Sequence, residues 1–444
     1  MNIDDRTAEL ELALAEVPVI DVHTHLVGGK LSARGLHDVL LYHMVISDLY
    51  ASGCPNGARL SQYPEWPSRD EAHSRIVEAI PYLRHIQNTS SFWGVRLILE
   101  ELYDWHDPIT LQNWVRLDDL IRERADDRLR SHAILDRLKI HRTGTEIARR
   151  EGGEDDDRLQ YALEWGFFTR CQWGEFDTAL YELERCWGRL PESPSPIGSG
   201  GRPSTDRTIQ SLRDVHEALD HYVASIPYDR IRSTATHIST DIRFRDVSED
   251  AMTCALARRA CAGAEERDIY ASYIQEHFLT ALESQGIVYQ FSLGAEPLPF
   301  ETASRLSQDT IAQLAEMIGR HPRLRFQCFL ASRHANQSLC TLARELPNLS
   351  LAGYWWHNFF PDAIAHVMRE RLDMLPMNRQ IGFFSDAYCV EWTFAKLVIV
   401  RKILARVLAE KIMIGQYSRE DALLIAREIL FESPQSLLGM SPRS

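Results

Sequence analysis

Two histidines near the start of the chain have the spacing of metal ligands. His23 and His25 follow the apolar run PVIDV and are separated by one residue. Alternate side chains of a strand point to the same face, so both imidazoles are expected to point the same way. Neutral imidazole is a good ligand for Zn, Mn, Fe or Ni. The pair therefore predicts a divalent-metal site, against the alternative of two surface histidines that fall together by chance.

A single acidic residue near the other end of the chain is the second candidate. Asp386 lies in the run FFSDAY, at the end of an apolar segment that we interpret as the last strand. One carboxylate oxygen could bind a metal while the other accepts a proton. The alternative is an N-cap for the helix predicted to follow. The histidine pair at the other end of the chain favours the ligand interpretation.

The segments around these residues alternate between short β-rich runs and helical periodicity. We predict eight strands, at residues 18–23, 133–141, 164–170, 230–237, 286–293, 324–330, 349–354 and 381–386. Helices are predicted between the later strands, at residues 309–320, 336–345 and 362–375. Such alternation indicates a parallel sheet, and eight units favour a closed (β/α)8 TIM barrel of the α/β class. Barrel enzymes keep their sites at the carboxyl ends of the strands, so His23, His25 and Asp386 would meet across the seam.

The uneven spacing of the strands predicts how the chain is organised. Residues 1–26 form an N-terminal helix and the first strand, and residues 27–130 form a helical insertion that caps the barrel mouth. Residues 131–444 form the rest of the barrel, with closing helices at 390–438, and all three parts make a single catalytic domain. The Pro-, Gly- and Ser-rich segment at 191–206 is expected to be an irregular loop within this domain.

Composition argues against several classes of function. The 444 residues carry 49 Lys+Arg against 63 Asp+Glu, a formal net charge of −14, which argues against nucleic acid as a partner. The longest apolar stretches are interrupted by charges, so no membrane span is expected. The eight cysteines include no CxxC pair, which is typical of reduced thiols in a cytoplasmic protein. Neither GxGxxG after a strand nor GxxxxGK[ST] occurs, so no dinucleotide or P-loop site is predicted.

Further polar residues follow the predicted strands at the same edge of the barrel. His237 ends the fourth strand and is either an extra ligand or acid–base group, or a structural histidine of the barrel. After the sixth strand, Arg333 is a candidate anion clamp and His334 a candidate acid–base group. Three candidates for substrate contact follow the seventh strand: Trp355, Trp356 and His357. The tryptophans could stack on a sugar ring, although large aromatics are more often packed in the core.

Motifs spread over almost the whole chain resemble those of a known family. They are VIDVHTHL, LLYH in the segment that follows, GFFTR, FLASRHANQ, LAGYWWHN, RERLDML and FFSDA. In order and spacing they resemble the uronate isomerases, within the amidohydrolase superfamily of metal-dependent barrels. The resemblance implies a mononuclear metal enzyme that interconverts the aldose and ketose forms of a hexuronate. Zinc is the first choice of metal, with Mn, Fe or Ni as alternatives.

The resemblance also implies roles for particular residues. His23, His25 and Asp386 become the ligands of one divalent ion, and Asp386 also moves the C2 proton. The residues implied for the substrate pocket are His43, Arg170 and Trp355 or Trp356. Among them, His43 is also a candidate for the chemistry itself. The implied partner is a small anionic or polyhydroxylated substrate, and large barrel enzymes often assemble as homo-oligomers.

Three positions depart from the family pattern. Met44 stands where the family commonly has Tyr, Tyr388 where it has Arg, and Glu296 where it has basic residues. Arg is the natural bidentate partner of a carboxylate, so these changes weaken the case for a hexuronate. Tyr388, a candidate catalytic residue, could hydrogen-bond the substrate instead, and Met44 is a candidate for substrate binding. The competing interpretations are a hydrolase, decarboxylase or lyase of the same superfamily, and a binding protein without turnover, which the intact ligand set disfavours.

Overall fold

The computed structural model describes most of the chain. The described residues are 2–28, 30–57, 67–125, 127–149, 156–164, 176–187, 207–238, 245–294, 306, 308–356 and 359–439. The Pro-, Gly- and Ser-rich segment expected to be a loop, 191–206, lies outside them.

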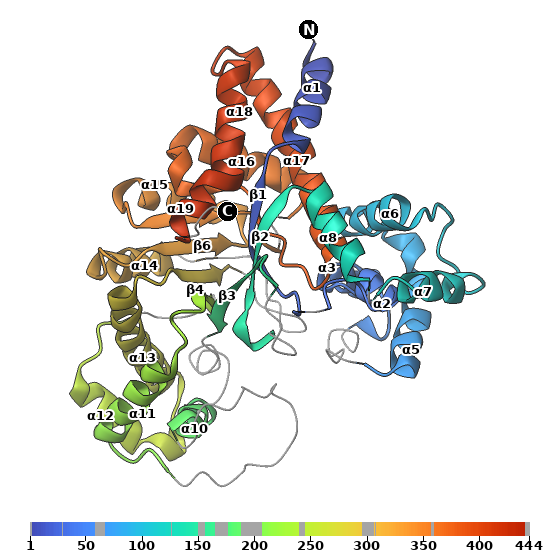
Figure 1. The fold of residues 1–444 in the computed structure, drawn as a ribbon. Coiled ribbons are helices and arrows are strands. Elements are labelled where there is room, and N and C mark those ends of the chain that lie inside the picture. Colours follow the sequence, from blue (N-terminus) through green and yellow to red (C-terminus); the bar gives the residue numbers. More distant parts are fainter. Residues whose placement is uncertain are drawn as a thin grey trace.

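Eight parallel strands form the centre of the molecule. They are β1 Val19–Thr24, β2 Ile140–Glu146, β3 Leu159–Glu164, β4 Ile231–Ile238, β5 Tyr289–Leu293, β6 Phe326–Leu330, β7 Leu349–Ala352 and β8 Gln380–Ile381. Each strand pairs in parallel with the next, in the order β1 to β8. Figure 1 shows the strands at the centre, with helices packed around them. The α/β class and the parallel order predicted from the sequence are confirmed.

The seam between the first and last strands is bridged without a ladder. Among the described strands, hydrogen-bonded pairing runs from β1 to β8 and does not join β8 back to β1. At the carboxyl end, the Asp386 N–H donates to the His23 carbonyl at 3.0 Å and the His25 N–H to the Ala387 carbonyl at 2.8 Å. Lower down, the Gly382 N–H donates to the Ile429 carbonyl at 2.7 Å. The sheet is therefore a curled half-barrel, and closure by strand pairing, as predicted, is not what joins its edges.

Apolar side chains fill the seam from the C-terminal end of the chain. Ile429 belongs to η7 Glu428–Glu432, which is followed by the short helix α19 Ser433–Leu437. Leu437 and Leu438 form one buried cluster with Ile20 of β1 and Ile381 of β8. Burying such side chains contributes about 1.5–3 kcal/mol each. The C-terminal segment thus supplies the contacts that a β1–β8 ladder would otherwise make.

The described part of the connection from β1 to β2 is mainly helical. Its helices are α2 Leu36–Leu40, α3 His43–Ala51, α5 Arg69–Ala79, η1 Ile80–His85, α6 Ser90–Tyr103, α7 Trp114–Arg122 and α8 Arg128–Arg137. In Figure 1 this group, coloured blue to cyan, lies on one side of the strands. That it is an insertion that covers the barrel mouth stays a prediction.

The remaining helices follow the predicted alternation. They are α1 Ile3–Ala15, α10 Phe176–Trp187, α11 Leu212–Ser225, α12 Glu249–Ala257, α13 Ala264–Gln285, α14 Gln308–Arg320, α15 Asn336–Glu345, α16 Pro361–Met374, α17 Val390–Met413 and α18 Arg419–Arg427. Short 3-10 turns are η2 Ile147–Arg149, η3 Arg259–Cys261, η4 Arg333–Ala335 and η6 Met377–Arg379. The helices predicted at 309–320, 336–345 and 362–375 are confirmed to within one residue. None of the helices in the described part of the chain combines the length and the apolar character needed to cross a membrane.

One predicted strand is wrong. Residues 133–137 belong to α8, and β2 begins only at Ile140. The apolar pair Ile134 and Leu135 that suggested a strand is the buried face of this helix. The observed strand, IHRTGTE, has few apolar residues, and two of its buried positions are the threonines Thr143 and Thr145. The alternation of apolar and polar residues that predicts a strand is therefore missing from it.

Two other strands are displaced from their predicted positions. β3 ends at Glu164, where the prediction begins, and residues 165–170 lie outside the described part. β8 spans only Gln380–Ile381 instead of 381–386. It ends early because Gly382 bonds to η7 and because the Ser385 N–H donates to the Asp21 carboxylate at 2.8 Å.

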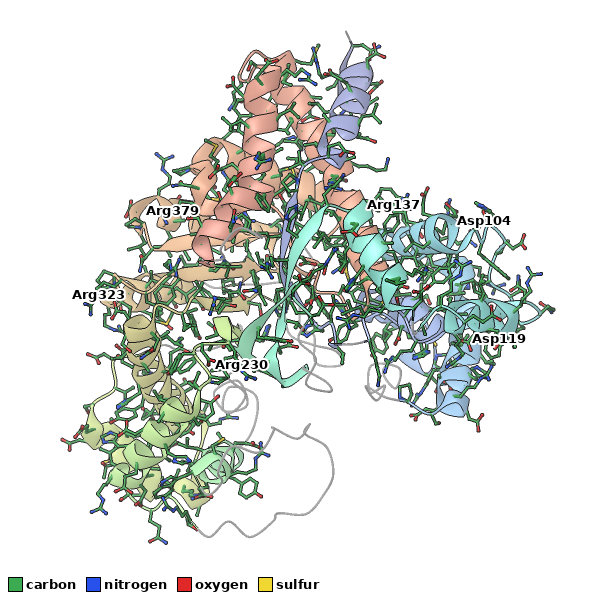
Figure 2. The ribbon with its side chains drawn as sticks, in the orientation of Figure 1. Asp104, Asp119, Arg137, Arg230, Arg323 and Arg379 are labelled. Atoms are coloured by element: carbon green, nitrogen blue, oxygen red, sulfur yellow. The ribbon has the colours of Figure 1, made fainter. Side chains whose placement is uncertain are left out.

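A buried acid on α17 joins the β1–β2 connection to the rest of the fold. Glu391 is fully buried, and its carboxylate accepts hydrogen bonds from the Ala33 N–H at 2.8 Å and the Tyr103 hydroxyl at 2.8 Å. The Arg130 guanidinium completes the cluster at 3.0 Å. Charged residues labelled in Figure 2, such as Asp104 and Arg323, lie instead at the outer edges of the molecule. A buried cluster of this kind has a larger electrostatic consequence for stability than exposed pairs have.

We expect Arg130→Met to destabilise the protein by about 3–5 kcal/mol, because it leaves the buried Glu391 carboxylate without its cation. The matched control is Arg96→Met on α6, whose partner Glu100 is part of an exposed pair and whose loss costs about 0.5 kcal/mol. Calorimetric unfolding of both variants checks the prediction. Equal thermal midpoints for the two would contradict it.

Candidate metal centre

The end of β1 and the segment after β8 bring three candidate ligands together. His23 and His25 leave the carboxyl end of β1, and Asp386 lies beside them through the seam hydrogen bonds described above. Asp386 has a φ of 54°, in the left-handed region that non-glycine residues seldom adopt. A residue in a sparsely populated backbone conformation therefore stands at the candidate site.

The distances from Asp386 to each of the two histidines fit pairs of ligand atoms that share one ion. Asp386 Oδ1 lies 3.1 Å from His25 Nε2 and 3.5 Å from His23 Nε2. Ligand atoms about 2.1 Å from a shared ion are about 3.0–3.4 Å apart at octahedral or tetrahedral angles. Burial raises the pKa of Asp386, but the hydrogen bonds from His23 and His25 outweigh it and hold that pKa well below its usual range. The carboxylate is therefore ionised and ready to bind a cation.

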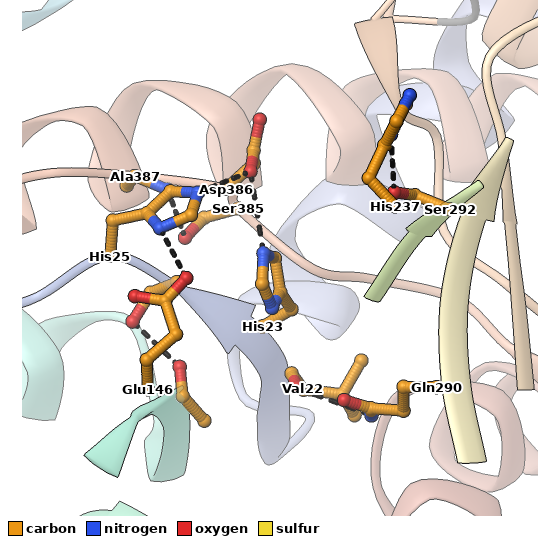
Figure 3. A network of polar contacts seen from close by, with 12 residues as sticks. Val22, His23, His25, Glu146, His237, Gln290, Ser292, Ser385, Asp386 and Ala387 are labelled. Atoms are coloured by element: carbon orange, nitrogen blue, oxygen red, sulfur yellow. Dashed lines mark hydrogen bonds and ion pairs between the residues drawn. The ribbon is translucent and has the colours of Figure 1, made fainter. Parts of the chain in front are cut away.

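A second carboxylate, absent from the sequence-based candidates, contacts the same histidine. Glu146 is the last residue of β2, and its Oε1 lies 2.7 Å from His25 Nδ1. One ligand atom each of His23, His25 and Glu146 lie within 4.8 Å of one another, which makes these three a possible metal-binding group. Figure 3 shows the His25 ring between Glu146 on one side and Asp386 on the other. Burial lowers the pKa of His25, but the Glu146 charge and the Asp386 hydrogen bond together raise it well above its usual value.

A glycine allows β1 and β2 to approach closely behind the histidines. A Cβ added to Gly144 would lie 2.4 Å from the Val22 carbonyl oxygen and 3.3 Å from the His23 nitrogen. Both contacts are with backbone atoms, which cannot rotate away. Gly144 is therefore needed for the spacing that sets His23 and His25 beside β2.

His43, predicted from the family resemblance, lies on the other side of Asp386. It is the first residue of α3, and its Nε2 is 3.5 Å from Asp386 Oδ2. Its ring stacks on Trp356, with centroids 4.8 Å apart and planes 5° from parallel. Burial lowers the pKa of His43 to about 3, so the ring is neutral at physiological pH. The Tyr42 hydroxyl donates to the Asp386 carbonyl at 2.9 Å and fixes the backbone between them.

Tyr388 and Met44 occupy different environments. Tyr388 is 45% exposed and stacks on the His25 ring at 4.6 Å. Its position beside the candidate ligands agrees with a role in substrate contact, which stays a prediction. Met44 is 6% exposed and belongs to the main hydrophobic core. Its predicted place in a substrate pocket is untested.

His237 is held by a neighbouring strand. Its Nδ1 lies 2.9 Å from the Ser292 hydroxyl of β5, and its ring centroid lies 5.1 Å from that of Trp355. Figure 3 draws this pair apart from the three candidate ligands. Within the described residues, the group of His23, His25 and Glu146 includes neither His237 nor Asp386. An acid–base role for His237 stays a prediction.

Two of the remaining candidates are described and two are not. Arg333 and His334 form the exposed turn η4 after β6. Their predicted roles as anion clamp and acid–base group are untested. Arg170 and His357 lie outside the described residues.

Three residues at or below the site were missed from the sequence. Glu146 is the last residue of β2, and the strand predicted from the sequence at 133–141 does not reach it. Asp21 is fully buried in β1, and burial raises its pKa to about 7. Lys396 is one of the charges that interrupt the apolar stretches, in α17, and the sequence gives it no role in the site. Its side chain is nevertheless buried, with 2% exposed. Its ammonium group lies 5.0 Å from the Tyr42 ring centroid, and burial lowers its pKa to about 8 against the attraction of Asp386 and Asp21.

Solved structures resemble this one over nearly the whole chain. The glucuronate isomerase from Caulobacter crescentus matches with a TM-score of 0.77 at 16% identity, covering 100% of this chain and 95% of that one. The uronate isomerase from Thermotoga maritima matches with a TM-score of 0.76 at 12% identity, covering 98% and 97%. The chain has the fold of the uronate isomerases.

A further match shows that the same fold is shared more widely. A protein named "putative metal-dependent hydrolase" from Lactobacillus casei matches with a TM-score of 0.61 at 12% identity, covering 97% of each chain. No protein-family model and no curated protein matches the sequence. At these identities the likeness establishes the fold, while the reaction has to be argued from the site.

We expect Gly144→Ala to destabilise the protein by about 1–3 kcal/mol and to weaken metal binding, because the new methyl group pushes β1 away from β2. The control is Gly319→Ala in α14, where nothing lies within 4 Å of the added Cβ and stability should rise by up to about 1 kcal/mol. Calorimetry and a metal titration of both variants test this. A Gly144→Ala protein as stable as the control would contradict the close approach.

Proposed function

We propose that the protein is a mononuclear, divalent-metal-dependent enzyme that interconverts the aldose and ketose forms of a sugar acid or a similar hydroxylated acid. The observation that carries the proposal is Asp386 Oδ1, which lies 3.1 Å and 3.5 Å from the two Nε2 atoms of His25 and His23. The fold shared with uronate isomerases supports it.

In this proposal His23, His25 and Asp386 bind the ion. Two neutral imidazoles and one carboxylate suit zinc as the first choice, with Mn, Fe or Ni as alternatives. The bound ion would polarise the carbonyl or hydroxyl next to the reacting carbon. Everything else in the reaction is assigned to side chains of this chain.

An aldose–ketose interconversion needs a group that moves a proton between neighbouring atoms. Asp386 Oδ2 points away from His23 and His25 and lies 3.5 Å from His43 Nε2. We assign the proton transfer to Asp386, with His43 as the neutral partner that exchanges a proton with it. Trp356 holds the His43 ring by stacking, so the ring faces Asp386 in one orientation.

The substrate proposed is small and hydroxylated. Trp356 and Tyr388, which stack on His43 and His25, are the aromatic rings beside the ligands against which we propose that a sugar carbon skeleton packs. Arg333, exposed after β6, and Arg170 are the candidate partners for a carboxylate group. Tyr388 supplies a hydroxyl near His25 but no charge.

A hydrolase is the second candidate. The observation that favours it is Tyr388, an uncharged ring stacked on His25 at a position where the resemblance leads one to expect an arginine. The similar fold of a protein named as a metal-dependent hydrolase supports it too. In that reaction Asp386 would accept the proton of a water molecule instead of a substrate carbon.

We expect His23→Ala and Asp386→Asn each to lose the bound metal and to abolish activity while leaving most of the fold intact, because each removes one of three ligands. Elemental analysis of the purified variants, together with circular dichroism, measures this. The control His106→Ala alters an exposed histidine of the β1–β2 connection and should keep one ion per chain. A metal content equal to the control in either ligand variant would overturn the assignment.

The reaction itself is tested by proton exchange. Metal-loaded protein is incubated in D2O with glucuronate or galacturonate, and NMR follows deuteration at C2 and formation of the ketose. Either signal, absent from Asp386→Asn, is expected. With bound metal verified, the lack of both would overturn the isomerase and direct a screen of esters, lactones, amides and carboxylated substrates toward a hydrolase, decarboxylase or lyase.

A further inference from the structure

We infer that Glu146 is a positioning residue of the metal centre: its carboxylate holds Nδ1 of His25 and so directs Nε2 of the same ring toward Asp386 and the ion. The inference rests on the proposed metal site and adds to it a residue that touches neither the ion nor the substrate.

The contacts of the His25 ring carry this inference. Glu146 Oε1 is 2.7 Å from Nδ1, and Asp386 Oδ1 is 3.1 Å from Nε2, so each ring nitrogen faces one carboxylate. A proton on Nδ1 directed at Glu146 leaves the lone pair of Nε2 for a metal. Carboxylates placed in this way fix the tautomer and the ring orientation of metal-binding histidines and make them stronger donors.

The spacing of the donors separates a positioning role from a ligand role. Two ligands of one ion are about 3.0–3.4 Å apart, and 2.7 Å between Nδ1 and Oε1 is shorter than that. It is the separation of a close ion pair between a histidine and a carboxylate. The distances from Asp386 Oδ1 to His25 and His23, 3.1 Å and 3.5 Å, lie near the ligand separation. With Asp386 as the third ligand of the proposed site, Glu146 supports His25 from behind.

The strand ends around Glu146 are fixed by side-chain hydrogen bonds. The Thr24 hydroxyl of β1 donates to the Gly144 carbonyl of β2 at 2.7 Å. The Thr145 hydroxyl of β2 donates in return to the Leu26 carbonyl at 2.7 Å. These reciprocal bonds flank His25 and Glu146 and set their relative position before any ion binds.

Burial gives the contact its strength. The Glu146 side chain is 8% exposed and that of His25 is 19% exposed. A pair shielded from water interacts more strongly than one on the surface, because solvent screens it less. Removal of the Glu146 charge should therefore change how firmly His25 binds an ion.

The test compares Glu146→Gln and Glu146→Ala with wild-type protein and with Glu164→Gln. Glu164 ends β3 at the same edge of the sheet and is exposed, so its variant is the matched control. The dissociation constant for Zn²⁺ is measured by competition with a chromophoric chelator. NMR of the zinc-loaded proteins follows the hydrogen-bonded imidazole N–H proton of His25.

We expect Glu146→Ala to weaken Zn²⁺ binding about 10- to 100-fold, the range for such supporting residues. Glu146→Gln should retain part of the affinity, because its amide oxygen still accepts the Nδ1 proton, and Glu164→Gln should match wild type. The His25 N–H signal should shift in the Gln variant and be lost by exchange in the Ala variant.

The outcomes separate this inference from the proposed function. Zinc affinity and N–H signal unchanged in both Glu146 variants, with wild type binding zinc, would overturn the positioning role and leave the metal enzyme standing. Complete loss of zinc from Glu146→Gln together with retention by Asp386→Asn would overturn it by making Glu146 the ligand. A wild-type protein that binds no divalent metal would overturn both.

Discussion

The buried negative charge of Asp386 is the constraint on which the rest of the site depends. A carboxylate shielded from water is costly unless positive or hydrogen-bonding groups surround it. His23 and His25 face one oxygen, His43 faces the other, and the ammonium group of Lys396 is close enough to influence the same charge. These four side chains surround the carboxylate of Asp386. A divalent cation bound there would add the positive charge that balances it.

The segment that carries Asp386 also takes part in closing the sheet. β8 ends at Ile381, and among the described strands no ladder joins it to β1. Two backbone bonds at the carboxyl end and the apolar C-terminal segment lower down take its place. The backbone bonds that join Asp386 and Ala387 to β1 therefore serve both the seam and the site.

Much of the candidate site could be predicted from the sequence. An apolar strand followed by a histidine pair, and a lone acid after the last strand, located His23, His25 and Asp386 because strand periodicity and barrel geometry are general rules. It failed at β2, where buried threonines replace the apolar alternation, and so it missed Glu146. Lys396 escaped for a related reason: a lysine within an apolar helix suggests an exposed position, whereas its burial depends on Asp21 and Asp386, which are far away in sequence.

The separation of 361 positions between His25 and Asp386 has a consequence for how the protein is made. At about 5–20 residues per second, a ribosome needs roughly 20–70 seconds to pass from one to the other. During that interval the histidine pair exists without its carboxylate, and the segment that fills the seam is made later still. The centre is thus assembled only after Asp386 has been made, so a product truncated before it would carry the histidines but no finished site for an ion.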